Sequence, residues 1–284
     1  MKELMYDINT IGIAGILFVS MVVAIEAGYR IGLRFQESAD DAAKSHITAI
    51  QASLLGILAL LLGFTFSLSL QRFDSRSEAV VDEANAIGTA YLRAQLLSDS
   101  VRGNVQELLR DYLDQRVRAG TISLAEQAER DVFVARANRI QTALWSYARQ
   151  AAKEDPNPVT AGLFIQALNE LIDAFGKRDA ALHRHVPEVV LLLLFGTFLM
   201  AGAILGYASG VSGHRTSFVT YVMVVLIVVL VFIILDLDRP RRGLIEVSQK
   251  SLIELQAAFN RDANAGAQQS LPTDIPRPAG AGRR

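Results

Sequence analysis

The stretch GFTFSLSLQRFD, Gly63 to Asp74, leaves a fully apolar run and reaches charged residues within a few positions. It contains no proline and no internal glycine, the residues that most strongly disfavour a helix interior. The run that it closes, Ile47 to Leu70, carries no charge, and about 20 apolar residues suffice to cross a bilayer. We therefore predict one helix that spans the membrane and continues into water, over about residues 48–97.

Three further apolar stretches are long enough to span a bilayer. They cover residues 8–29, 186–207 and 217–235, and with residues 47–70 they give four predicted transmembrane helices. Hydrophobic residues make up 51% of the chain, while proline is rare. The sequence therefore predicts an all-α, polytopic membrane protein. The leader MKELMYD lacks the net positive charge of a signal peptide, so we expect the first span to be retained.

The remaining segments have the composition of a helical bundle and a tail. Three helices are expected in the central segment. The first covers 100–118, and the second runs from an N-cap at Ser123, with Glu126 in capping-box spacing, to about Lys153. The third covers 159–184 and follows a break at DPNP. The predicted organisation is spans 1 and 2 in 1–70, a helical bundle in 71–185, spans 3 and 4 in 186–238, a C-terminal helix in 239–262 and a disordered tail in 263–284.

Charge and cysteine content exclude several classes of protein. A net charge of −1 argues against nucleic-acid binding, and the absence of cysteine excludes disulfides, thiolate metal sites and a cysteine nucleophile. In HRHVPE, His185 and Glu188 share a face but His183 does not, so we expect no metal or cofactor. No catalytic set or phosphate-binding loop is present, and we expect no enzyme. Lys and Arg gather at the membrane ends of the side that holds both termini and 71–185, which predicts that this side is cytoplasmic.

The second span carries candidate pore residues. Ser53, Gly56, Leu60, Gly63 and Ser67 recur at steps of three and four, so one helix face is mostly small. The hydroxyls of Thr65 and Ser69 project on a neighbouring face, with Phe64 and Phe66 close by in sequence. These residues fit either a pore lining with an aromatic constriction or ordinary close packing of helices.

Glycines also recur in the third span. Gly202, Gly206 and Gly210 form consecutive small-xxx-small steps, the pattern of a helix that approaches another closely. The pattern does not say whether the partner helix belongs to the same chain or to another copy.

Two polar strings lie outside the spans. LDLDRPRRG closes the fourth span with Asp236, Asp238, Arg239, Arg241 and Arg242, and it fits a membrane anchor, a structural clamp of paired charges or a ligand site. VVDEANAIG follows the second span and places Asp82, Glu83 and Asn85 around a helical seam. Asn85 has the position of a polar residue that sets helix register.

The DEANAIG string, within residues 60–97, and the DRPxxG string, within residues 235–248, resemble a bacterial membrane family described as bestrophin-like. The resemblance implies the layout of bestrophins, which are pentameric anion channels. In these, two spans, a cytosolic helical block and two more spans follow one another, and the second span lines a pore with a hydrophobic neck. Phe64 and Phe66 would then lie near the neck. No acidic calcium clasp follows the fourth span.

The resemblance and the residues together favour an oligomeric ion channel in the bacterial inner (plasma) membrane. Its expected partners are the lipid bilayer, further copies of the chain and chloride or another small ion. The alternative is a non-conducting scaffold or sensor whose bundle binds partners. A transporter is disfavoured because no broken helix pair or mid-membrane charge is evident.

Overall fold

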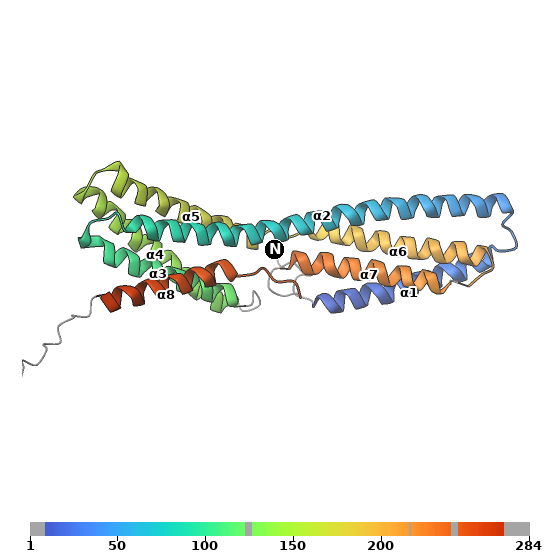
Figure 1. Cartoon of the computed structure of the whole chain (residues 1–284). Helices are drawn as coiled ribbons and strands as arrows, with labels where there is room; N and C mark the ends of the chain where they lie inside the picture. The colour runs from blue at the N-terminus through green and yellow to red at the C-terminus, as the bar shows by residue number, and fades with distance from the viewer. Residues whose placement is uncertain (1–8, 123–126, 216, 240–243, 270–284) are drawn as a thin grey trace, which may run out of the picture. The chain divides into compact units, whose positions relative to one another are not determined.

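The structure, a computed structural model, describes residues 9–122, 127–215, 217–239 and 244–269. Throughout these residues the regular elements are helices, and no strand occurs among them. The order along the chain (Figure 1) is α1 Thr10–Arg34, α2 Asp41–Ala94, α3 Asp99–Thr121, α4 Gln127–Glu154, a π-helical turn Pro158–Gly162, α5 Leu163–Leu182, α6 Glu188–Val211, α7 Phe218–Asp238 and α8 Lys250–Gln269. The all-α class predicted from the sequence is confirmed.

Four of these helices are long and apolar enough to cross a membrane, namely α1, α2, α6 and α7. They coincide with the four predicted spans. Helix α2 runs for 54 residues without interruption, as the single long ribbon of Figure 1 shows. At 1.5 Å per residue it measures about 80 Å, far more than a bilayer requires. The prediction that the second span continues as one helix is confirmed.

Helix ends differ from the prediction at the C-terminal side. Helix α8 begins at Lys250 and continues to Gln269, so residues 263–269, predicted to be disordered, are helical. Alanine and glutamine in this stretch favour a helix and offset its single Gly266. The predicted N-cap Ser123 and the tail from 270 onwards lie outside the described residues.

The chain divides into two compact units. The membrane unit comprises Met1–Ala79, Ser123–Gln127 and Phe175–Ser248. The bundle unit comprises Val80–Ile122, Ala128–Ala174 and Gln249–Arg284. Each of α2 and α5 contributes one part to the first unit and the other part to the second.

The core of the membrane unit is built on α1. Ile13, Leu17, Met21 and Ile25 recur every four residues and are all buried, so they form one stripe along the helix. This stripe belongs to one cluster with residues of the other three spans, which are Leu58, Leu191, Leu194, Phe198, Ala201, Val224, Val231 and Leu235.

The bundle unit has an independent apolar core. Its helices each bury one stripe, as amphipathic helices in water do. The fully buried side chains include Ile87 of α2, Val101, Val105, Leu109 and Leu113 of α3, Leu144 of α4, and Phe164, Leu168 and Leu171 of α5.

Candidate functional site

The membrane-spanning part of α2 is the most exposed of the four spans. Only 6% of its most apolar stretch is buried within the chain, against 39% for α6. Ile57, Leu60 and Phe64 are each more than half exposed. They follow one another at steps of three and four and so share one face of the helix. A single copy of the chain therefore leaves a broad apolar face of α2 uncovered.

The structure separates the four predicted pore residues. Phe64 lies on the exposed face, whereas Thr65 and Ser69 are buried inside the chain and Phe66 is half-buried. The Thr65 hydroxyl donates to the carbonyl oxygen of Leu61, 2.8 Å away. The Ser69 hydroxyl has no hydrogen-bond partner among the described atoms. Because successive residues of a helix are about 100° apart, the hydroxyls do not share the face of Phe64.

The glycines of the second and third spans lie in different surroundings. A Cβ on Gly56 or Gly63 of α2 would meet no atom within 4 Å. A Cβ on Gly202 would contact the Met21 carbonyl oxygen at 3.4 Å. On Gly206 or Gly210 it would overlap the backbone of α1. The glycine line of α6 therefore faces α1 of the same chain, while that of α2 faces no helix of its own chain.

Arg76 joins three segments of the membrane unit. Its side chain is 1% exposed, and its guanidinium donates four hydrogen bonds to backbone carbonyls. Nε reaches Ala181 O at 3.2 Å, Nη1 reaches Leu237 O at 3.0 Å, and Nη2 reaches Arg184 O at 2.7 Å and Asp238 O at 3.0 Å. The planar fork of an arginine is suited to such divergent acceptors. Arg76 thus ties α2 to the end of α5, to the connection before α6 and to the end of α7.

Asp238 supplies the opposite charge at this junction. Its carboxylate accepts a hydrogen bond from Val186 N at 2.9 Å and lies 3.3 Å from Arg72 Nη1 and 4.0 Å from Arg76 Nη2. Its side chain is 2% exposed. Charged partners and a backbone N–H together offset the cost of burying the carboxylate.

Two further charges near Asp238 form hydrogen bonds with other segments, namely Asp236, which precedes the DRPxxG string, and Arg239, which belongs to it. The Asp236 carboxylate accepts from Leu244 N at 3.1 Å and from Ile245 N at 2.9 Å. Buried Arg239 donates through Nη1 to Thr10 Oγ1 at 3.1 Å. Each of these contacts links two segments of the membrane unit. Arg241 and Arg242 lie outside the described residues.

The DEANAIG string places one acid inside the bundle unit. Glu83 is fully buried and forms an ion pair with Arg116 of α3, with Oε1 and Nε 2.6 Å apart. Tyr112 donates to the same oxygen at 3.3 Å and accepts from Gln141 Nε2 at 3.2 Å. Burial, and then the Glu83 charge, raise the pKa of Tyr112 well above its ordinary value. Asp82 and Asn85 are exposed, so the structure does not bring them to Glu83.

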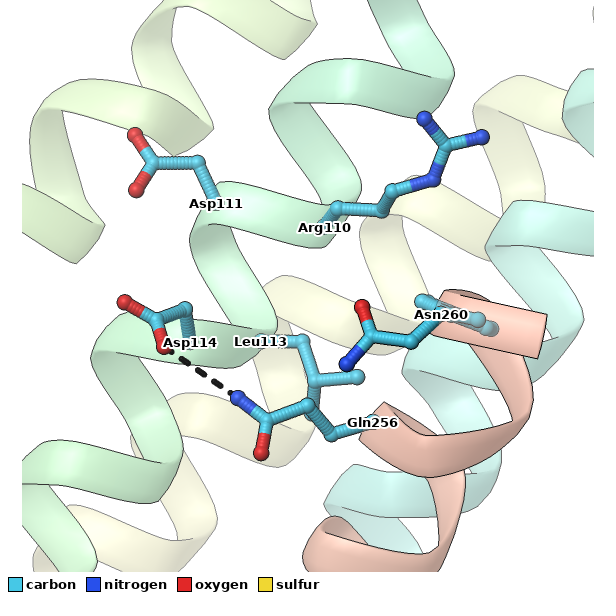
Figure 2. A pocket seen from close by; sticks show the side chains of 7 residues that line it. Arg110, Asp111, Leu113, Asp114, Gln256 and Asn260 are labelled. Carbon is cyan, nitrogen blue, oxygen red and sulfur yellow. Dashed lines mark hydrogen bonds between the residues drawn. The ribbon is translucent and has the colours of Figure 1, made fainter. Parts of the chain in front are cut away.

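A pocket of about 340 Å³ lies between α3 and α8 in the bundle unit. Figure 2 shows Asp111 and Asp114 on one side of it and Arg110 pointing away from both acids. Gln256 donates to Asp114 Oδ1 at 3.2 Å. Arg110 donates to the Tyr91 hydroxyl at 2.9 Å, and the Tyr91 ring stacks on Phe259 at 4.0 Å between centroids. The sequence did not indicate this pocket, because it depends on where α8 packs.

Acid and histidine side chains do not gather into a metal-binding cluster in the described part of the chain.

Comparison with known proteins agrees with this architecture. The fold matches solved structures of a bacterial bestrophin homologue from Klebsiella pneumoniae. One variant has 16% identity, covers 88% of this chain and 97% of that chain, and gives a TM-score of 0.63. A second variant has 16% identity, covers 88% of this chain and 97% of that chain, and gives a TM-score of 0.62. A third has 18% identity, covers 87% of this chain and 96% of that chain, and gives a TM-score of 0.60. No curated protein matches the sequence. A bestrophin-like domain matches residues 18–252, and the chain therefore belongs to the bestrophin-like family.

Proposed function

We propose that the protein is an oligomeric ion channel in which α2 of each copy faces a common axis. The observation that carries the proposal is the exposed face of α2, an apolar face that no other helix of the same chain covers. Membership of the bestrophin-like family supports it. Both termini and the bundle unit would lie in the cytoplasm of a bacterial cell, as the distribution of Lys and Arg indicates.

The composition of this face suits contact with other α2 helices better than contact with lipid alone. Gly56 and Gly63 leave open space where a side chain would stand. Small residues allow helix backbones to approach closely in a membrane. Ile57, Leu60 and Phe64 would then project towards the axis between the close contacts. Rings of such side chains form hydrophobic constrictions that gate by excluding water.

The same face becomes polar beyond the apolar stretch. Gln71 and Ser75 are exposed and lie seven and eleven residues after Phe64, so they share its side of the helix. Thr65 and Ser69 stay inside the chain and would not contact a permeating ion. A pathway along this face would pass from an apolar constriction to hydroxyl and amide groups. Such groups and the adjacent Arg72 favour an anion, chloride among them.

A flux assay on proteoliposomes tests the proposal. Phe64→Ala should increase or otherwise change anion flux, because it removes a ring from the constriction. Phe66→Ala is the matched control, since Phe66 is half-buried and projects from another side of the helix. Native mass spectrometry should give the same closed ring for both variants. Absence of flux through the wild type, or equal flux through all three proteins, would refute the channel.

Cysteine labelling tests separately whether the face meets water. The chain has no native cysteine. Ser67→Cys on the exposed face should react with a membrane-impermeant thiol reagent in the assembled protein. Thr65→Cys, which is buried in the chain, should stay unreactive. An unreactive Ser67→Cys would mean that lipid or protein covers the face.

A non-conducting scaffold or sensor is the second candidate function. The pocket between α3 and α8 favours it, because charged and amide side chains line a hollow that the membrane spans do not need. A monomeric or dimeric mass in detergent would leave no axis for α2 helices to surround. That outcome would favour this candidate over the channel.

A further inference from the structure

A second hollow, of about 210 Å³, lies in the membrane unit where the apolar part of α2 ends. Its walls come from one chain. Leu68, Gln71, Arg72 and Ser75 of α2 form one side, and Ala181 and Arg184 form the other. The hollow thus combines two guanidinium groups, an amide and a hydroxyl with two apolar side chains.

The two arginines of this cavity are held in different ways. The carbonyl oxygen of Arg184 accepts the 2.7 Å hydrogen bond from buried Arg76, so the backbone at this position is anchored. The Arg184 guanidinium itself is exposed and has no ion-pair or hydrogen-bond partner among the described residues. Arg72 uses Nη1 for Asp238, and its side chain remains 26% exposed. Donors of both arginines are therefore available on either side of the hollow.

We propose that this cavity binds a phosphate group through Arg72 and Arg184. Arginine is the side chain best matched to phosphate oxygens, because its N–H groups donate in a planar fork. The Gln71 amide and the Ser75 hydroxyl supply two further donors for the remaining oxygens. The Asp238 carboxylate lies against Val186 N and the two arginines Arg72 and Arg76, so these three side chains together keep a net positive charge beside the cavity.

Two sources of phosphate fit the position of the cavity. Gln71 and Ser75 lie on the α2 face that the proposed channel turns towards its axis, where free phosphate arrives from water. A face that meets lipid would instead place a phospholipid headgroup at this transition from apolar to charged residues, with Leu68 and Ala181 against its upper acyl carbons. The choice between the sources rests on the proposed function, which favours free phosphate, and the experiment separates the two.

The experiment measures ligand-dependent thermal stabilisation of the detergent-purified full chain. A ligand that binds only the folded state raises the unfolding midpoint in proportion to its occupancy. Short-chain phosphatidylglycerol and sodium phosphate are the two probes. Short-chain phosphatidylcholine and sodium chloride at equal ionic strength are their blanks. Arg184→Gln removes the exposed guanidinium of the cavity. Arg34→Gln is the matched control, because Arg34 is likewise exposed, at the end of the candidate span α1, but lies outside the cavity.

The wild type and Arg34→Gln should bind sodium phosphate alike, and Arg184→Gln about tenfold more weakly, as expected for one lost charge-assisted contact. Stabilisation by the lipid alone identifies a headgroup site. An equal Arg184-dependent effect of sodium phosphate identifies a free-phosphate site. The proposal is overturned if Arg184→Gln responds like the wild type to both probes, or if Arg34→Gln loses as much. Binding is measured without ion flux, so this result stands apart from the test of the channel.

Discussion

Glu83 and Arg116 form an ion pair in which both side chains are buried, at 0% and 4% exposure respectively. The pair joins α2 to α3 within the bundle unit, and Tyr112 and Gln141 extend it. A buried carboxylate is tolerated only when opposite charge and hydrogen bonds replace the water that it has lost. The two side chains therefore depend on each other.

Glu83→Gln should destabilise the bundle unit by about 3–5 kcal/mol, because Arg116 would remain charged and buried without the opposite charge of Glu83. The double variant Glu83→Leu with Arg116→Met should be less destabilised than Glu83→Gln, since it removes both charges. Denaturant unfolding followed by fluorescence measures both. The only tryptophan of the chain, Trp145, lies on α4 of this unit and reports its unfolding.

Glu107→Gln is the control for this prediction. It removes the same charge from an exposed position on α3 of the same unit, and surface changes of this kind alter stability by about 0.5 kcal/mol or less. Equal destabilisation by the two single variants would show that the loss of a negative charge matters, and that burial of the pair does not.

Tyr112 gives the bundle unit a dependence on alkaline pH. Burial and the Glu83 carboxylate raise the pKa of Tyr112 in the folded state, while the unfolded side chain titrates near 10. The stability from the protonated phenol is thus present below about pH 10 and is lost as pH rises above it, because only the unfolded state then releases the proton. The denaturation midpoint should fall progressively as pH rises above about 10.

Tyr112→Phe should remove this part of the pH dependence. Tyr147→Phe, which removes a phenol from α4 of the same unit, should leave it in place. If the midpoint falls as steeply in Tyr112→Phe as in the wild type, other groups account for the alkaline sensitivity.

The sequence predicted the helices of this protein well because its signals are local. Four apolar runs and the lack of a breaker after Gly63 were enough to predict the spans and the continuous α2. The spacing of Gly202, Gly206 and Gly210 indicated a close approach of helices, and the structure shows α1 of the same chain against them.

The junction could not be predicted in the same way because its partners are distant in sequence. Arg76 follows the second span and has the pattern of an ordinary surface residue, yet its acceptor at Asp238 is 162 residues away. Helical periodicity placed Phe64 and Thr65 about 100° apart. It could not tell which of the two faces the interior, because that depends on how α2 packs against the other spans.

The contact of α6 with α1 predicts a large difference between two glycine substitutions. A Cβ on Gly206 would overlap the backbone of Ile25, which cannot move aside as a flexible side chain can. Gly206→Ala should therefore destabilise the membrane unit by about 1–3 kcal/mol or more. Gly196→Ala on the same helix meets no atom within 4 Å and should be neutral or slightly stabilising, since alanine favours helix. The fraction of protein that stays monodisperse after heating in detergent measures both, and equal behaviour would contradict the close contact.

Arg76→Lys tests whether the junction needs the shape of a guanidinium or only a positive charge. A lysine amine keeps the charge near Asp238 but donates from a single nitrogen, so it cannot reach four carbonyls on three segments. Each carbonyl left without a donor in a buried position costs about 1–3 kcal/mol. We expect the membrane unit to lose at least about 2 kcal/mol.

Arg30→Lys is the control for this last variant. Arg30 pairs with Glu26 on α1 in the same unit, but its side chain is 73% exposed, so water replaces any lost contact. Its substitution should change the free energy of unfolding by no more than about 0.5 kcal/mol, and should therefore leave the heating curve in detergent almost unchanged. If Arg76→Lys proves as mild as Arg30→Lys, attraction to Asp238 holds the junction. If Arg76→Lys unfolds at clearly lower temperature, the hydrogen bonds to the three segments hold it, because the charge is unchanged.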